Sequence, residues 1–284
     1  MLDKVLSAKL REYGPQNAIE QDNVLQELMQ HYVLASLSRA GLFRDAIFHG
    51  GTCLRIVNGM NRFSEDLDFL LKRPDPSFRW QGYLEAVRKD CVQEGITFEV
   101  QDKADATSAV RKAFLKTDPI GKPLTLELPF ERYHARKLRI KLEIDTNPPA
   151  GSVFTTSYIT FPVTAPLTTQ SLESSFALKL HALLCRSYVK GRDWHDFVWY
   201  VARKVRPDLA LLEHAIEQQG PWAGQRTRLT WPWLMANLRI VIERIDWAVA
   251  RQDVQRFLPL REREALSLWD ETFFKYHMQA LRDG

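Results

Sequence analysis

Apolar residues recur with helical spacing over the first forty positions of the chain. From 24 to 37 they return every three to four residues, which predicts an amphipathic helix, and Gly41 supplies a stop for that helix. A short apolar run at 46–48 ends at the tripeptide His-Gly-Gly of 49–51. This pattern predicts a strand that enters a tight turn, with a short helix after the turn at 54–57.

Strict alternation of apolar and polar residues predicts strands further along. Apolar residues alternate with acidic ones in 66–71, and four aliphatic residues alternate with four charged ones in 138–145. The ranges 97–100 and 124–130 also have the composition of strands. We expect 124–130 to pair with 138–145 as a hairpin through 131–137.

Helical spacing appears at 78–94 and dominates from about residue 171 to the end. Between these segments, 146–170 is rich in Pro, Thr and Ser, and we interpret it as a loop with one short strand at 158–161. The pattern therefore predicts an α+β chain with a boundary near residue 166, where a sheet-containing part gives way to a mainly helical part.

Composition narrows the class of protein. Of the 284 residues 45% are hydrophobic and 26% charged, which is enough apolar material for a core, so we do not expect disorder. Three widely spaced cysteines without a Cys-x-x-Cys pair argue against a disulfide framework and a zinc site. No apolar run approaches about 18 residues, and the N-terminus lacks a signal-peptide core, so we expect a cytoplasmic protein without a membrane partner. The net charge of +4 is compatible with a nucleic acid or nucleotide partner but does not require one.

Asp66 and Asp68 are the first candidates for chemistry. Residues two apart on a strand share a face, with Cα atoms roughly 6.5 Å apart, so both carboxylates converge on one side. Like charges this close are unfavourable unless a cation lies between them, and hard ions such as Mg²⁺ choose oxygen ligands. Two ions about 3.5–4 Å apart suit this spacing. A solvated strand face is the competing interpretation, and Asp-x-Asp alone favours it.

A glycine turn precedes this acidic pair. Gly50, Gly51 and Thr52 are followed by 13 residues before Asp66. Two glycines let the backbone approach a ligand closely, and Thr52 offers a hydroxyl and an N–H at a predicted helix N-terminus, which attracts phosphate. Alone, the tripeptide is more simply a strand-to-helix turn. Joined to Asp-x-Asp at this separation, it predicts a phosphate-binding turn beside a metal site.

A third carboxylate is expected on the strand 138–145. The aliphatic residues of this strand take one face, and Arg139, Lys141, Glu143 and Asp145 take the other. Either acid can meet the acidic pair if the two strands are neighbours. We prefer Glu143 and place Asp145 second. An amphipathic edge strand with its charges in water explains the pattern equally well.

Lys179 lies in a helical segment, 172–185, that is apolar nearly all round and should therefore be buried. A lysine there is costly to bury unless it meets an anion. A nucleotide triphosphate is one such anion, and an internal Asp or Glu is another. Asp193 can orient this lysine or an attacking hydroxyl, or it can cap a helix, and the sequence leaves these roles open.

Taken together, these segments resemble the AbiEii/AbiGii family of nucleotidyltransferase toxins, within the DNA polymerase beta-like superfamily. The resemblance spans roughly residues 25 to 200. It is carried by His-Gly-Gly-Thr-Cys-Leu-Arg at 49–55, Arg-Phe-Ser-Glu-Asp-Leu-Asp-Phe at 62–69, the Lys-x-Glu-Ile strand at 141–144, the lysine helix at 176–183 and the Arg-Asp-x-x-Asp segment ending at Asp196.

The resemblance implies a polymerase beta-like nucleotidyltransferase domain, with a mixed sheet flanked by helices, in residues 1–165. A mainly helical C-terminal domain follows in residues 166–284. Known relatives are toxins of bacterial toxin–antitoxin or phage-defence pairs that add nucleotides to tRNA acceptor ends. We therefore expect Mg²⁺-dependent transfer from an NTP, with release of pyrophosphate, to tRNA or another RNA, and a cognate antitoxin. Basic clusters at 132–141 and 186–206 can hold RNA, although solvated charge also explains them.

The site residues that this resemblance implies fall into three overlapping groups. The metal ligands, for two Mg²⁺ ions, are Asp66, Asp68 and Glu143. The residues that hold the NTP are Gly50, Gly51, Thr52, Ser64 and Lys179. The catalytic residues are Asp66, Asp68, Glu143, Lys179 and Asp193.

Two other functions fit the same residues. An enzyme of this superfamily can add AMP or UMP to a protein hydroxyl, in which case label from an NTP appears on protein instead of RNA. A protein that kept the fold and lost catalysis can act as a binding or regulatory protein. The intact acidic triad argues against the second, and an Asp68→Asn variant with unchanged activity would favour it.

Overall fold

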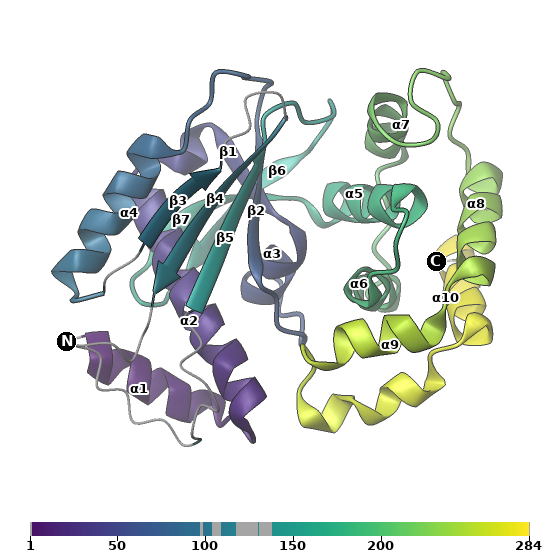
Figure 1. Cartoon of the computed structure of the whole chain (residues 1–284). Coiled ribbons are helices and arrows are strands. Elements are labelled where there is room, and N and C mark those ends of the chain that lie inside the picture. Colours follow the sequence, from purple (N-terminus) through teal and green to yellow (C-terminus); the bar gives the residue numbers. More distant parts are fainter. Residues whose placement is uncertain (1, 97–98, 104–108, 118–129, 131–137, 284) are drawn as a thin grey trace. The chain divides into compact units, whose positions relative to one another are not determined.

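The computed structural model describes residues 2–96, 99–103, 109–117, 130 and 138–283. The chain folds into two compact units (Figure 1). The first consists of residues 1–148 and 155–169, and the second of residues 149–154 and 170–284. Among the described helices, none combines the length and apolar character that a membrane crossing needs.

A mixed sheet forms the centre of the first unit. In the described part of the chain it has seven strands, in the order β3-β4-β5-β2-β1-β7-β6. Their bounds are β1 Ala46–His49, β2 Asp66–Leu71, β3 Glu99–Lys103, β4 Val110–Thr117, β5 Leu138–Asp145, β6 Phe154–Ile159 and β7 Ala165–Gln170. The β2 strand is antiparallel to β1 and parallel to β5, and β4 is antiparallel to both β3 and β5. The expected mixed sheet is thus confirmed.

Helices of the first unit pack around this sheet. Their bounds are α1 Leu2–Tyr13, α2 Ala18–Arg39, the 3-10 helix η1 Leu42–Arg44, α3 Gly50–Ile56 and α4 Gln81–Gln93. Figure 1 shows α2 and α4 along the sheet. The core between them contains the aromatic rings of Phe48, Phe69 and Trp80, whose neighbouring centroids are 5.6 and 5.9 Å apart. The aliphatic residues of β5 are buried on this side, as their alternation predicts.

The second unit is helical in its described residues. Its elements are α5 Leu172–Cys185, α6 Gly191–Ala202, α7 Leu209–Gln218, α8 Trp231–Arg244, α9 Trp247–Gln255, the 3-10 helices η2 Leu260–Glu262 and η3 Glu264–Leu268, and α10 Glu271–Asp283. Aromatic side chains join the helices: Trp247 stacks on Phe274 at 4.1 Å, and Phe176 of α5 stacks on Tyr200 of α6 at 4.5 Å. Burial of such large rings supplies most of the stabilisation between helices.

The stretch 146–170 differs from its expected conformation. It contains β6 and β7 where we expected a loop with one short strand at 158–161, so that expectation is wrong. The β6 strand lies at the edge of the sheet and is mostly exposed, so its Thr and Ser residues show no apolar alternation. A composition typical of loops is therefore also compatible with an exposed edge strand.

The neighbour of β5 also differs from expectation. β4, which no pattern predicted, pairs with β5 along its whole length. The expected strand at 124–130, apart from Phe130, and the connection 131–137 lie outside the described residues, as do the first two residues of the strand expected at 97–100.

Candidate active site

Three carboxylates share one face of the sheet because of the register between β2 and β5. This parallel pairing sets Asp68 beside Glu143 and Asp66 beside Lys141. Residues paired in this way point to the same face, opposite the face on which Leu67 and Phe69 of β2 and the aliphatic residues of β5 are buried. Asp66, Asp68 and Glu143 therefore form one acidic cluster, which we call the acidic triad.

Asp145, the second choice for the third acid, lies one step beyond this cluster. Its partner on β2 is Leu70, not an acid. Its carboxylate accepts a hydrogen bond from the backbone N–H of Asn147 at 2.8 Å, and burial raises its pKa in spite of that bond. Asp145 thus belongs to the turn that ends β5.

The glycine turn packs directly on the acidic triad. His49 at the end of β1 pairs with Asp68, and Gly50 follows with a positive φ of +77°. A Cβ placed on Gly50 would lie 2.6 Å from the Asp68 Oδ2 atom, closer than any real Cβ contact. Only glycine satisfies both the backbone conformation and this approach.

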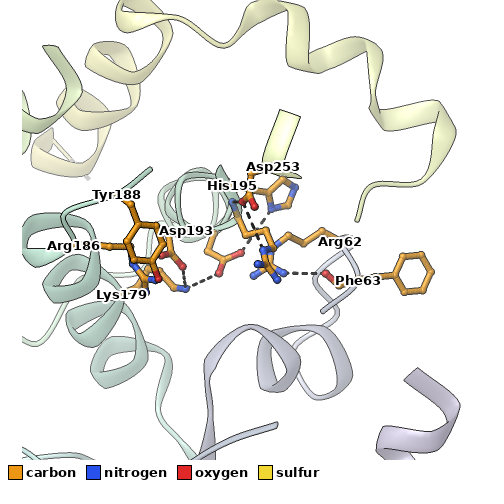
Figure 2. Close-up of polar contacts among 10 residues, drawn as sticks. Arg62, Phe63, Lys179, Arg186, Tyr188, Asp193, His195 and Asp253 are labelled. Carbon is orange, nitrogen blue, oxygen red and sulfur yellow. Dashed lines mark hydrogen bonds and ion pairs between the residues drawn. The ribbon is translucent and has the colours of Figure 1, made fainter. Parts of the chain in front are cut away.

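Ser64, in the loop before β2, lies beside Gly51 of the glycine turn. A Cβ on Gly51 would lie 2.5 Å from Arg62 Nη2 and 3.0 Å from Ser64 Oγ. The Arg62 guanidinium donates a hydrogen bond to the Phe63 carbonyl at 2.9 Å (Figure 2). Gln30 of α2 anchors the backbone of this loop, because its side-chain amide donates a hydrogen bond to the Ser64 carbonyl at 3.0 Å. Ser64 is therefore fixed beside the glycine turn.

Thr52 has a structural role in addition to any contact with a ligand. Its side chain is fully buried, and its hydroxyl donates a hydrogen bond to the carbonyl oxygen of Asp66. This bond ties α3 to the first residue of β2. The hydroxyl is therefore occupied, and the backbone N–H is the group that Thr52 can offer to a phosphate.

Two lysines neutralise part of the acidic triad. Lys141 Nζ lies 2.8 Å from Glu143 Oε2 and 3.8 Å from Asp66 Oδ2, and Lys112 Nζ of β4 lies 3.4 Å from Glu143 Oε1. Burial opposes the charged form of Lys141, but its hydrogen bond to Glu143 and the surrounding carboxylates raise its pKa above the ordinary value. Lys141 is therefore a permanent cation between two of the three acids.

The donor set of the acidic triad fits a divalent cation. Carboxylate oxygens are the ligands that Mg²⁺ and similar hard ions take, and the absent Cβ of Gly50 lets the Asp68 carboxylate pack directly on the glycine turn. Among the described residues, no three His, Cys, Asp or Glu side chains already enclose an ion. Small side-chain rotations, with movement of the Lys141 ammonium, would be needed to bring the triad around a metal.

A second cluster of charges lies between α5 and α6, in the second unit. Lys179 Nζ contacts Asp193 Oδ1 at 2.7 Å and Asp196 Oδ2 at 2.9 Å, and Arg186 Nε lies 3.3 Å from Asp193 Oδ2. Figure 2 shows Lys179, Arg186 and Asp193 converging, with Tyr188 against the arginine. Both acids are almost completely buried, so the anion that Lys179 meets in the structure is an internal one.

Asp193 is not the N-cap of α6. Lys190 occupies that position, and Asp193 lies in the first turn of the helix. Burial penalises the Asp193 carboxylate, yet Lys179, Lys190 and Arg186 lower its pKa below the ordinary range. Asp193 is therefore ionised and positions the Lys179 ammonium, the first of the roles that the sequence left open.

The basic residues of 186–206 are mostly engaged within the second unit. Arg192 Nε lies 3.6 Å from Asp253 Oδ2, and the guanidinium of Arg203 covers the Trp199 ring at 3.9 Å. In the other predicted basic cluster, residues 132–137 lie outside the described part of the chain. Lys141, which belongs to the same predicted cluster, contacts Glu143 of the acidic triad.

Three side chains that contact candidate site residues were not singled out by sequence reasoning. Asp196, the second anchor of Lys179, was visible only as part of a motif. Lys112 contacts Glu143 because β4 pairs with β5, and no local pattern marks it. In the sequence pattern, Gln30 is one polar residue of a predicted amphipathic helix, and nothing there marks it as special. These residues act through contacts across long sequence separations, which periodicity does not encode.

Comparison with known proteins gives one family and one shared fold. The family model described as "Nucleotidyl transferase AbiEii toxin, Type IV TA system" matches residues 32–274. Among solved structures, JHP933 from Helicobacter pylori is similar, with a TM-score of 0.52 at 18% identity over 92% of both chains. MenT4, a nucleotidyltransferase toxin from Mycobacterium tuberculosis H37Rv, has a TM-score of 0.49 at 18% identity, over 97% of this chain and 98% of that one. No curated protein matches the chain. At this identity, the likeness to JHP933 indicates a common fold.

Proposed function

This chain belongs to the AbiEii nucleotidyl transferase toxin family of type IV toxin–antitoxin systems, and on that basis we propose that it transfers a nucleotide from an NTP to the 3′ end of a tRNA with Mg²⁺ as its metal. Family membership makes the chain a nucleotidyltransferase toxin, with an NTP as substrate and a cognate antitoxin as partner. The acceptor, the metal ion and the roles of individual residues are our proposal.

The observation that carries this proposal is the acidic triad. In the sheet, Asp68 lies beside Glu143 and against Gly50, which joins the carboxylates to the turn expected to bind phosphate. An ordinary solvated strand face offers no reason for a glycine with positive φ to pack on one of its carboxylates. A site that binds a metal and a triphosphate requires this proximity, because the metal must touch both the protein and the phosphate oxygens.

In the proposed reaction the acceptor hydroxyl attacks the α-phosphorus of the NTP. A new P–O bond forms, the bond from the α-phosphorus to the bridging oxygen breaks, and pyrophosphate leaves. Two Mg²⁺ ions, held by Asp66, Asp68 and Glu143, would neutralise the charge on the reacting phosphate and on the leaving group. Glu143 takes the proton of the attacking hydroxyl, and Lys141 orients Glu143 by the hydrogen bond described above.

The phosphates are proposed to bind at the glycine turn. Backbone N–H groups of residues 50–52 and the Ser64 hydroxyl would hold the β- and γ-phosphates, with Thr52 contributing its N–H alone. Lys179, held by Asp193, is the proposed cation for the same phosphates. Its part is supported by the match of its helix to the family motif and by the two carboxylates that hold its ammonium in place at 2.7 and 2.9 Å.

Each labelled NTP, incubated with total RNA, Mg²⁺ and the purified protein, tests this function. We expect label on the 3′ end of tRNA, its loss with EDTA, and at least about a thousandfold lower rate for Asp68→Asn with an unchanged circular dichroism spectrum. Asp45→Asn is the matched control, since Asp45 is an exposed acid outside the site.

The acceptor and the chemistry are tested separately by this assay. Label on protein instead of RNA would assign a protein hydroxyl as the acceptor and contradict the tRNA proposal. Transfer that persists in Asp68→Asn would contradict the role of the acidic triad.

A further inference from the structure

The β4–β5 side of the acidic triad carries a cationic surface of its own. In the antiparallel register of these strands, Lys112 pairs with Glu143 and Phe114 pairs with Lys141. Arg139 lies two residues before Lys141 and therefore shares its face. The face that carries the acids on β2 and β5 thus continues, toward β4, into Lys112, Phe114 and Arg139, which we call the β4–β5 platform. Figure 1 shows β2, β5 and β4 as neighbouring strands.

The side chains of this platform have a defined arrangement. The Arg139 guanidinium lies over the Phe114 ring, 4.1 Å from its centroid, and the ring is only 6% exposed. Arg139 itself is exposed, so one plane of its guanidinium is backed by an aromatic ring and the other faces outward. The Lys112 side chain is 47% exposed, and its ammonium reaches Glu143 at 3.4 Å.

The contact between Lys112 and Glu143 adds little to stability. In an ion pair this exposed, water screens the attraction and the loss of side-chain freedom offsets it, and Lys141 already neutralises the same carboxylate at a shorter distance. Lys112 lies beside Glu143, the proposed proton acceptor, and its ion pair is not needed to stabilise the fold.

The order of the strands indicates whether the β4–β5 platform lies on the side of the NTP phosphates or on the side of the attacking acceptor. Across the sheet, the glycine turn follows β1, the acidic pair is on β2, Glu143 is on β5, and the platform extends to β4. In phosphoryl transfer the attacking and leaving oxygens lie roughly in line on opposite sides of the phosphorus. If the leaving pyrophosphate is held at the glycine turn, the attacking hydroxyl must come from the opposite side, which is the β5–β4 side.

We propose that the β4–β5 platform binds the single-stranded 3′ end of the nucleic acid acceptor. Lys112 contacts the phosphodiester next to the terminal nucleotide, and a terminal base stacks on the outward plane of Arg139, which Phe114 holds flat. Stacking on arginine and aromatic planes, combined with lysine contacts to the backbone, is how proteins hold unpaired strands. This inference rests on the proposed function for the direction of attack.

The test compares the Lys112→Ala and Arg139→Ala variants with the wild-type protein. A fluorescent RNA hairpin with an unpaired 3′ tail serves as the probe, and its Kd is measured by anisotropy at two salt concentrations. We expect each variant to bind the tailed hairpin about tenfold more weakly. Lys112→Ala should also reduce the slope of log Kd against log salt by about one ionic contact. Arg139→Lys should keep the wild-type slope of log Kd against log salt but bind the tailed hairpin more weakly. The lysine retains the positive charge but has no planar group on which a base can stack.

Matched controls separate this site from general loss of charge. Lys89→Ala and Arg88→Ala remove exposed cations of the same kinds from α4 and should leave the Kd unchanged. A hairpin with a blunt end should bind the wild type and the platform variants equally, since it offers no unpaired base. The Kd for a non-hydrolysable NTP should also stay at the wild-type value in Arg139→Ala, since the Arg139 guanidinium packs on Phe114.

The outcomes distinguish this inference from the proposed function. Label transfer to RNA with unchanged Kd and KM for the tailed RNA in both variants would overturn the platform and leave the proposed function standing. A different outcome is also informative: both variants lose tail binding, but the wild-type protein labels no RNA. That result would support the platform as a nucleic acid site and contradict the proposed reaction. Equal loss of affinity in the α4 controls would also overturn the platform.

Discussion

Gly50 packs against Asp68 so closely that a Cβ on the glycine would lie 2.6 Å from the carboxylate oxygen. This contact joins two segments that the sequence separates, the glycine turn before α3 and a strand that carries acids.

Gly50→Ala should lower the rate of nucleotide transfer by about a hundredfold, because the new methyl group displaces the Asp68 carboxylate by a substantial part of an ångström. Gly59→Ala is the matched control. Gly59 also has a positive φ, of +71°, but a Cβ placed on it would meet nothing within 4 Å. Both variants should lose about 1–2 kcal/mol of stability from backbone strain, and only Gly50→Ala should lose activity. Equal activity of the two variants would mean that the contact with Asp68 is not needed for catalysis.

Lys179→Met should lower the free energy of unfolding by about 3 kcal/mol or more, measured with urea, because Asp193 and Asp196 then remain buried without their shared cation. Adding Asp196→Asn to this variant should restore part of the lost stability by removing one buried charge. Transfer activity should stay low in the double variant if Lys179 also binds phosphate. Activity that returns together with stability would assign Lys179 a purely structural role.

Gly191→Ala should destabilise the protein by about 3 kcal/mol or more, because its Cβ would lie 1.8 Å from the Ala250 carbonyl oxygen and would force α6 away from α9. Gly82→Ala, in α4, is the comparison, since nothing lies within 4 Å of that Cβ. It should raise the stability by about 0.5–1 kcal/mol through the lower entropy of the unfolded chain. Thermal unfolding of both variants measures the difference, and a Gly191→Ala protein as stable as wild type would show that α6 and α9 can separate at no cost.

Acidification should weaken the fold through His31 and His181. Burial lowers the pKa of both imidazoles, although for His181 the bond to the Gln219 carbonyl opposes the shift. As the pH falls through about 6.5, the unfolded chain takes up protons before the folded one, so the stability present above that pH is progressively lost. Each histidine contributes a slope of at most about 1.4 kcal/mol per pH unit.

Urea unfolding at several pH values between 7.5 and 5 checks this dependence. The double variant His31→Gln, His181→Gln should show a flatter profile than the wild type over that interval. An identical profile for the two proteins would show that other groups control the acid response.

The sequence was sufficient for the local parts of the candidate site. The alternation of 66–71 and 138–145 predicts their strands and buried faces, because period-two burial is a property of each strand by itself. The turn at Gly50 was also predictable from the sequence, because glycine adopts the positive φ that a tight turn between a strand and a helix requires. The strand β6 was not readable, because an exposed edge strand needs no apolar residues.

The task of Thr52 illustrates a different limit. Its position at a predicted helix start favours a phosphate contact, whereas its hydroxyl is bonded to the Asp66 carbonyl in a fully buried position. Lys179 shows the same limit. The apolar helix around it indicated that the lysine needs an anion. The identity of that anion, a pair of acids on α6, depends on how the two helices pack.

By itself, the sequence determined the chemistry available to this protein: an Asp-x-Asp strand, a glycine turn, a buried lysine and the family to which they belong. Only the tertiary structure decided which acid joins Asp66 and Asp68, because the register between β2 and β5 places Glu143 beside Asp68 and Asp145 beside Leu70. It also decided that Lys112 and Lys141 lie among the acids. Register and strand order arise from hydrogen bonds and packing between distant segments, and no window of neighbouring residues contains that information.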